Sequence, residues 1–277
     1  ARTSASAAPA PRSPIRRASL RSRVRGAAYS GLLADRVALV TGGIRGLGSA
    51  IARTFAEAGA RGTVVDLEPG ACPEGWVSLT ADVTAEEDVE RVVAATVERF
   101  GRVDVVVANA GVVPPWSDAT SFDLDALDRT LAVNVRGVAA TIKHGARALQ
   151  GSGGAIVVMA SMNAWHAFPA QGAYTASKHA ALGLVRTAAL DLGRHGIRVN
   201  AIGPGPVATD ALRERLARRA AGGGPSPDEA LRQAAAGTAL GRMVTEDDVA
   251  RAALFLASDL SSGITGALVP VDAGIRP

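Results

Sequence analysis

The sequence has little of the residues that mark several specialised classes of protein. Cys72 is its one cysteine, so no disulfide can form within the chain, and we expect a reducing, cytoplasmic compartment. The four histidines show neither the HExxH nor the CxxC spacing of zinc sites, so we predict no bound metal. Nowhere do about 18 apolar residues follow one another, so we expect no helix that crosses a membrane.

The chain has enough apolar residues to form a full hydrophobic core. It has 277 residues, of which 48% are hydrophobic and 20% charged, and this composition excludes disorder along the whole chain. Aromatic residues make up only 4%, so the core is built from small aliphatic side chains. We expect an ordinary soluble α/β protein.

Residues 1–30 differ in composition from the rest of the chain. They carry seven arginines and no acidic residue, whereas the remaining 247 residues carry 23 basic and 26 acidic groups. Ala, Ser, Arg and Pro predominate without apolar periodicity, so we predict a disordered basic extension. Such a segment also resembles an organelle transit peptide or a nucleic-acid-binding arm. Because arginine outnumbers lysine 28 to 2 in the whole chain, we interpret it as a solvated extension and expect no nucleic-acid partner.

From residue 36, short apolar runs alternate with longer segments of helical periodicity. This alternation is typical of βαβ units and a parallel sheet. We therefore predict an α/β, Rossmann-like, doubly wound, seven-stranded parallel sheet with helices on both faces, in one domain over 31–277. The runs predict strands at 36–41, 62–66, 76–80, 103–109, 154–161, 197–202 and 267–272, with helices near 46–58, 85–100, 121–147, 173–193 and 246–257.

An insertion interrupts the alternation near the end of the chain. Residues 209–240 hold two short helical patterns, which GGGPSP at 222–227 separates. Glycine and proline at such a break are typical of a loop. We predict a substrate lid near 206–240.

The segment TGGIRGLG at 41–48 directly follows the first predicted strand and precedes a predicted helix. Its glycines allow a sharp turn and a close approach to a pyrophosphate, which the free amides of the next helix would bind. Asp66, at the end of the second strand, would accept hydrogen bonds from the adenosine ribose and repel a 2′-phosphate, which favours NAD over NADP. Arg45 favours the opposite choice, because a guanidinium can pair with that phosphate.

Tyr174 and Lys178 lie four residues apart in a predicted helix, although the chain has only two tyrosines and two lysines. This spacing places their Cβ atoms ~5 to 6 Å apart on one face. A nearby ammonium lowers the pKa of an acid by ~1 to 3 units, so we predict that Lys178 lowers the pKa of Tyr174 and makes it a general acid/base. Ser161, at the carboxyl end of the predicted strand 154–161, would hydrogen-bond a carbonyl oxygen while Tyr174 exchanges its proton.

Three short motifs occur in order along the chain. They are TGGIRGLG at 41–48, ANAG at 108–111 and YTASK at 174–178. Over residues 34–277 the chain resembles the short-chain dehydrogenase/reductase family, whose TGxxxGxG loop, NNAG turn and YxxxK pair they match. Ala108 departs from the NNAG pattern, which affects the end of a strand more than the chemistry.

The resemblance implies roles for individual residues. It implies that Asn134 holds a water linking Lys178 to solvent, that Lys178 also binds the nicotinamide ribose, and that Asp82 binds the adenine. The implied catalytic residues are Asn134, Ser161, Tyr174 and Lys178. The predicted cofactor-binding residues are Gly42, Arg45, Gly46, Leu47, Gly48, Asp66, Asp82, Val83, Asn109, Ala110, Gly111, Tyr174, Lys178, Pro204, Gly205, Val207 and Thr209.

The expected substrate is an apolar secondary alcohol or ketone, and cyclic compounds belong to this class. Trp116, Trp165 and Phe168 near the reaction site favour it, although these side chains would equally serve to pack the lid onto the body. We predict an NAD(H)-dependent alcohol dehydrogenase or ketoreductase, which the resemblance implies to be a homotetramer. The alternatives are an NADPH-dependent 3-oxoacyl carrier-protein-type reductase and a noncatalytic dinucleotide-binding protein.

Overall fold

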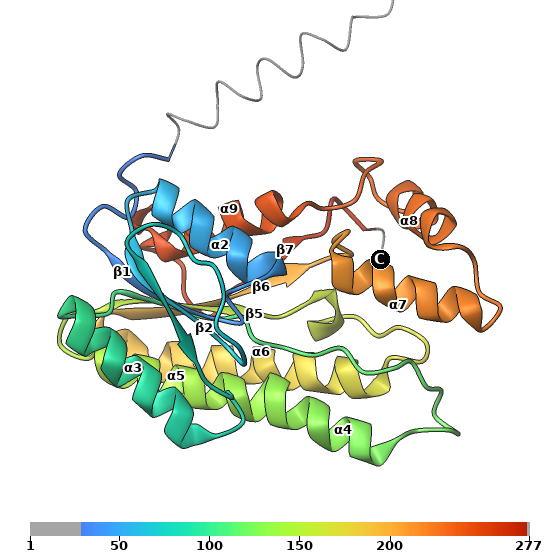
Figure 1. The fold of residues 1–277 in the computed structure, drawn as a ribbon, viewed down its shortest axis with the longest axis horizontal. Coiled ribbons are helices and arrows are strands. Elements are labelled where there is room, and N and C mark those ends of the chain that lie inside the picture. The colour runs from blue at the N-terminus through green and yellow to red at the C-terminus, as the bar shows by residue number, and fades with distance from the viewer. Residues whose placement is uncertain (1–28, 276–277) are drawn as a thin grey trace, which may run out of the picture.

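One parallel sheet of seven strands lies at the centre of residues 29–275, the part of the chain that the computed structural model describes (Figure 1). The strand order is β3-β2-β1-β4-β5-β6-β7. The first three strands are added outward in one direction and β4 to β7 in the other, so the topological switch point lies between β1 and β4. The predicted fold is confirmed, and the strand ends shift by no more than two residues. The strands are β1 (Val37–Thr41), β2 (Arg61–Asp66), β3 (Trp76–Thr80), β4 (Val105–Ala108), β5 (Gly154–Met159), β6 (Ile197–Pro204) and β7 (Leu268–Val271).

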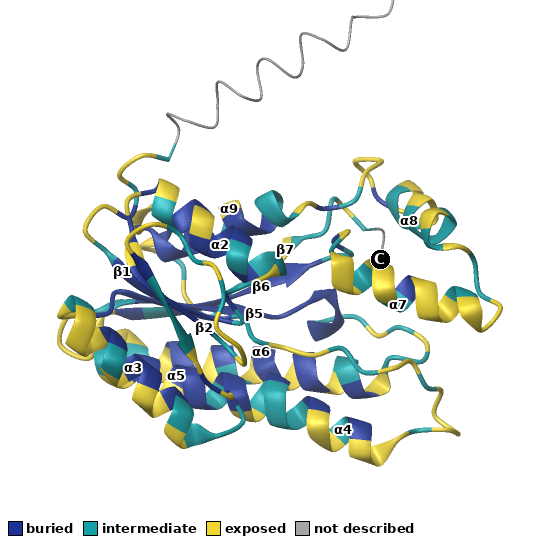
Figure 2. Ribbon diagram, viewed as in Figure 1, coloured by how far each residue is buried: buried dark blue, intermediate teal, exposed yellow. Residues whose placement is uncertain are grey.

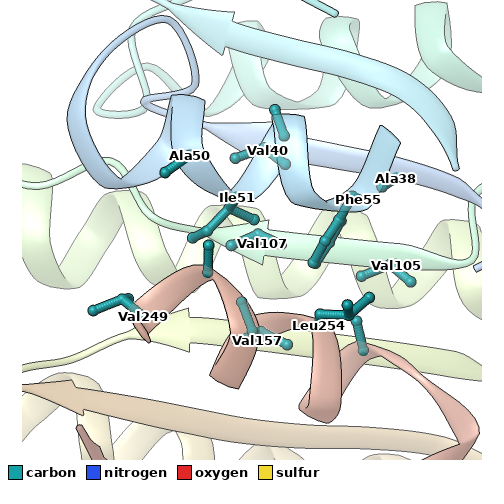
Figure 3. Packing of buried hydrophobic residues seen from close by; sticks show 14 of the residues in the cluster. Ala38, Val40, Ala50, Ile51, Phe55, Val105, Val107, Val157, Val249 and Leu254 are labelled. Atoms are coloured by element: carbon teal, nitrogen blue, oxygen red, sulfur yellow. The ribbon is translucent and has the colours of Figure 1, made fainter. Parts of the chain in front are cut away.

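The central strands are apolar on both faces, as a sheet covered on both sides requires. Alternate residues point to opposite faces, so Val40 and Val107 pack on one side, while Leu39 and Val106 pack on the other. On the first side, Phe55 is fully buried between the sheet and its covering helices (Figure 3). Two apolar layers therefore hold the sheet in place.

The helices divide between the two faces of the sheet. α2 (Gly46–Glu57) and α9 (Glu246–Ala257) pack together on one face, and α3 (Glu86–Phe100), α5 (Val138–Leu149) and α6 (Gly172–Leu192) cover the other (Figure 1). Their outward sides are exposed and their inward sides buried (Figure 2). None of the helices in the described part of the chain is both long and apolar enough to cross a membrane.

The long helix expected near 121–147 is interrupted. The structure has α4 (Leu124–Leu131), a π-helical turn (Ala132–Gly137) and α5 in its place. Gly137 lies against Val83, where an added methyl group would come within 2.7 Å of the valine side chain. Single π-helical turns often occur at functional sites, and this one contains Asn134.

Two short helices, α7 (Asp210–Ala221) and α8 (Pro227–Ala236), form the predicted insertion. Only Leu216 of α7 is buried, and α8 has no buried residue, so this segment packs loosely at the carboxyl end of the sheet (Figures 1 and 2). Of the predicted basic extension, residues 1–28 lie outside the described residues. Tyr29, which we assigned to that extension, is partly buried against the first apolar layer.

Candidate functional site

A cleft of about 910 Å³ lies at the carboxyl ends of the strands, where loops from both halves of the sheet meet α7. All the residues predicted to bind the cofactor line it, and so does Ser161. Asn134 lies behind the cleft wall and is fully buried. The lining residues that the sequence predicted are Gly42, Arg45, Gly46, Leu47, Gly48, Asp66, Asp82, Val83, Asn109, Ala110, Gly111, Ser161, Tyr174, Lys178, Pro204, Gly205, Val207 and Thr209.

The glycine-rich loop between β1 and α2 can exist only with glycine at key positions. A methyl group on Gly48 would come 2.0 Å from the carbonyl oxygen of Gly42, which is closer than atoms can approach. Gly42 itself has a φ of +63°, in the left-handed region that favours glycine. The loop therefore folds back on itself and presents the N-terminus of α2, where free amides and the helix dipole favour an anion, to the cleft.

Thr41 and Asn109 tie this loop to the turn after β4. The Thr41 hydroxyl donates to the carbonyl of Val107 at 3.3 Å and accepts hydrogen bonds from the amides of Asn109 and Ala110, both at 3.1 Å. The Asn109 side-chain amide donates to the carbonyls of Thr41 and Gly42, both at 2.9 Å. Asn109 thus braces two cleft walls, and Thr41, which we left out of the predicted site, is its partner.

Asp66, the last residue of β2, lies at one end of the cleft, beside the glycine-rich loop. Its carboxylate accepts hydrogen bonds from the amides of Ile44 at 3.3 Å and Leu67 at 3.0 Å. The amide of Ile44 belongs to the glycine-rich loop, so the carboxylate lies directly beside the loop that would hold the pyrophosphate. This geometry fits an acceptor for ribose hydroxyls.

At the other end of the cleft, Ser161 and Tyr174 lie close enough for the Ser161 hydroxyl to act on the ionisation of the phenol. Ser161 follows β5, where its hydroxyl also accepts the Asn163 amide at 3.2 Å, and Tyr174 lies in the first turn of α6. Burial raises the pKa of Tyr174, while the Ser161 hydroxyl and the charge of Arg215 oppose the shift. The phenol is therefore protonated at neutral pH.

Lys178 lies one turn after Tyr174 and is buried. Its Nζ atom donates to the carbonyl of Met159 at 2.8 Å and lies 5.7 Å from the centre of the Tyr174 ring. Burial lowers the pKa of Lys178 to about 8. Our expectation that Lys178 lowers the pKa of Tyr174 is wrong for this structure, because burial dominates and the opposing charge is that of Arg215.

Asn134 positions the wall beside Lys178. Its side chain accepts a hydrogen bond from the Val112 amide and donates to the Val112 carbonyl, both at 2.8 Å, and it also donates to Ser177 at 3.1 Å. A methyl group on Gly111 would come within 3.2 Å of Asn134 and 3.6 Å of Lys178, so the three residues are neighbours. Because these hydrogen bonds fix its side chain, Asn134 is a positioning residue. That it holds a water molecule linking Lys178 to solvent stays a prediction.

Several residues of the site gave no usable signal in the sequence. Asn163 donates to Gln171 at 3.1 Å and to Thr175 at 2.9 Å, which joins the segment after β5 to the start of α6. Arg215 reaches the cleft from α7, far along the chain from Tyr174. Neither lies in a family motif, so only the folded chain reveals them.

Two of the three aromatic residues expected near the substrate line the cleft, namely Trp116 and Phe168. Trp165 packs instead over Gly203 of β6, whose missing side chain leaves room for the indole ring. In residues 29–275, no group of three or more His, Cys, Asp or Glu side chains is arranged to hold a metal ion.

Comparisons with known proteins show which proteins the chain is similar to. A family model described as enoyl-(acyl carrier protein) reductase matches residues 42–276. Short-chain dehydrogenase reductase 5 of Arabidopsis thaliana is 41% identical over 254 residues, which cover 87% of this chain and 95% of that protein. (+)-Borneol dehydrogenase 2 of Salvia officinalis is 39% identical, over 87% of this chain and 89% of that protein.

A solved structure has the same fold. Carveol dehydrogenase from Mycobacterium avium, in complex with NAD, superimposes with a TM-score of 0.82 and 32% sequence identity. The match covers 88% of this chain and 99% of that one. The likeness therefore extends over almost the whole of the described chain.

Gly48→Ala tests the glycine-rich loop. Because the new methyl group overlaps the Gly42 carbonyl, we expect the free energy of unfolding to fall by about 1 to 3 kcal/mol and NADH affinity to fall at least ~10-fold. Urea unfolding and NADH fluorescence titration measure the two effects. Gly183→Ala is the control, since a methyl group there meets no atom within 4 Å and α6 gains helix propensity. Wild-type values for both quantities in Gly48→Ala would contradict this account of the loop.

Proposed function

This chain belongs to the short-chain dehydrogenase/reductase family of oxidoreductases, and we propose that it transfers a hydride between NAD(H) and a secondary alcohol or its ketone. One observation carries the proposal. The neighbouring side chains of Ser161 and Tyr174 lie with Lys178 in the same cleft as the residues predicted to bind a dinucleotide. A proton donor for the substrate oxygen and a hydride carrier for the adjoining carbon would thus meet at one carbonyl group.

The residues of the cleft fit a nicotinamide dinucleotide. The glycine-rich loop leaves room for the pyrophosphate, and Asp66 lies beside it as an acceptor for ribose hydroxyls. Lys178 is 3% exposed, and its ammonium has more donors than its single bond to Met159 uses, so it can also bind hydroxyl groups of the second ribose. When bound, the nicotinamide supplies or accepts the hydride.

The side chains at the Tyr174 end of the cleft would carry out the proton transfer. In ketone reduction, the protonated Tyr174 donates to the substrate oxygen as negative charge develops there. Ser161 holds that oxygen by a second hydrogen bond and also stabilises the phenolate that remains. In alcohol oxidation, the phenolate takes the proton from the hydroxyl group.

The substrate end of the cleft supports a secondary alcohol or ketone with an apolar carbon skeleton. Trp116 and Phe168 form part of its walls, together with Val112 and Met162. Two of the similar proteins are dehydrogenases named for the alcohols borneol and carveol. The segment 206–240 would act as a lid, because it packs loosely over this end. A homotetramer and a cytoplasmic location stay predictions.

Arg45 favours a second candidate, an NADPH-dependent 3-oxoacyl carrier-protein-type reductase. Its exposed side chain lines the cleft directly after the glycine-rich turn, where it would meet a 2′-phosphate. Asp66 opposes this candidate, because a carboxylate beside that phosphate repels it.

Tyr174→Phe tests the proposed chemistry. Without the phenolic oxygen, we expect kcat for ketone reduction to fall ~10²- to 10⁴-fold, with most of the NADH affinity retained because the rest of the cleft is unchanged. Steady-state absorbance assays with cyclohexanone and NADH, and NADH fluorescence titration, measure these quantities. Tyr29→Phe, at the chain's other tyrosine, should keep wild-type rates. Full turnover in Tyr174→Phe would exclude the proposed acid/base.

The pH dependence of the two directions follows from the raised pKa of Tyr174. Because the acid form predominates at neutral pH, ketone reduction should be fast near pH 7 and slow as the pH rises. Alcohol oxidation needs the base form, so its rate should increase from pH 7 to 10. Initial rates in a constant-ionic-strength buffer series check both slopes. Oxidation rates that stay flat over this range would contradict the assignment of Tyr174.

Asp66→Ala tests the choice of cofactor. We expect the wild type to prefer NADH to NADPH, and the variant to lose about 10- to 100-fold in kcat/KM with NADH, because charge-assisted hydrogen bonds to the ribose disappear. Its preference should therefore weaken or reverse. A wild type that prefers NADPH, with the preference abolished in Arg45→Ala, would favour the second candidate instead.

A further inference from the structure

Arg215 is a cation that α7 brings to the reactive end of the cleft. It lines the cleft, is partly buried, and lies close enough for its charge to act on Tyr174. The next residue, Leu216, is buried and holds this face of α7 against the body. The guanidinium therefore faces the cleft at the place where substrate oxygen atoms would react.

Two other arginines of α7, Arg213 and Arg219, have partners, whereas Arg215 has none among the described residues. Arg213 forms an ion pair with Asp228 at 4.0 Å, and the Arg219 guanidinium lies 4.9 Å above the Trp116 ring. Among residues 29–275, no ion pair or hydrogen bond satisfies the Arg215 guanidinium, although its charge interacts with Tyr174 and Arg218. Four acidic side chains line the cleft, and none of them forms an ion pair with Arg215. They are Asp66, Asp82, Asp210 and Glu246.

Removing a cation from water is unfavourable unless an anion or strong acceptor replaces the lost hydration. Burial accordingly lowers the pKa of Arg215, the ionised form of Tyr174 raises it, and the like charge of Arg218 lowers it further. A bound anion would compensate this charge. The planar guanidinium matches a carboxylate, which it can bind through two parallel hydrogen bonds.

We propose that Arg215 binds an anionic group of the substrate, so that the preferred substrate is a secondary alcohol or ketone that also carries a carboxylate. Arg219, one turn further along α7, lines the same cleft and adds a second positive charge. The walls around Trp116 and Phe168 hold the carbon skeleton, and Ser161 and Tyr174 hold the reacting oxygen. This inference rests on the proposed function, because it specifies the substrate of the same site.

A pair of ketones that differ only in charge tests the inference. The probes are 3-oxocyclohexane-1-carboxylate and its uncharged methyl ester, each reduced with NADH by the wild type, Arg215→Met and Arg218→Met. Arg218 is the matched control, since it is an exposed arginine of the same helix that does not line the cleft. We expect the wild type and Arg218→Met to prefer the carboxylate by about 10- to 100-fold in kcat/KM. Arg215→Met should reduce both ketones at similar rates, with the loss mainly in KM.

A binding measurement separates recognition from turnover. Cyclohexanecarboxylate has no ketone, so its affinity for the protein saturated with NADH reports the anion site alone. Calorimetry should detect binding to the wild type and to Arg218→Met, and at least ~10-fold weaker binding to Arg215→Met. Circular dichroism and thermal unfolding would verify that Arg215→Met is folded.

Three results would overturn the inference. The first is a wild type that reduces the ester as efficiently as the carboxylate. The second is an equal loss for both ketones in Arg215→Met, which would assign Arg215 to the ionisation of Tyr174. The third is a loss of NADH affinity in Arg215→Met with the carboxylate preference intact, which would assign Arg215 to the diphosphate of the cofactor. Absence of NADH-linked reduction of every ketone tested, cyclohexanone included, would instead refute the proposed function.

Discussion

The close approach of two loops at the centre of the sheet is the constraint on which the site depends. Thr41 and Asn109 join the loop after β1 to the turn after β4 through a set of short hydrogen bonds. The approach is possible only because Gly42 and Gly48 have no side chains to keep the backbones apart. Because these strands lie at the switch point of the sheet, the cleft opens between them, and every other group of the site is placed relative to this junction.

Burial governs the chemistry of the reactive end. It stabilises the neutral forms of both Tyr174 and Lys178, since a charge is less well solvated in the protein than in water. Polar partners lie beside both groups: the Ser161 hydroxyl beside Tyr174, and the Met159 carbonyl, which accepts a hydrogen bond from Lys178. Such preorganised partners need no rearrangement when charge develops during proton transfer.

The site combines rigid and loosely packed parts. β5 and α6 carry Ser161, Tyr174 and Lys178, and both elements are anchored in the second apolar layer. α7 and α8 contribute Leu216 as their one buried residue, and segments with so few apolar contacts open most easily. Under the proposed function, the rigid body would carry out the hydride and proton transfer, and the loosely packed α7 and α8, where Arg215 and Arg219 lie, would select the substrate.

The sequence alone determined the order of strands and helices, since apolar periodicity is a local property of the chain. It also identified the glycine-rich loop and the Tyr174 and Lys178 pair, because each depends on spacing within a few residues. It did not determine the π-helical turn at Asn134, the brace between Thr41 and Asn109, or the direction of the shift in the pKa of Tyr174. These depend on burial and on contacts between segments far apart in the chain. Arg215 is an example. Its charge acts on Tyr174 only because α7 packs over the cleft, and no local pattern in the sequence predicts this contact between distant segments.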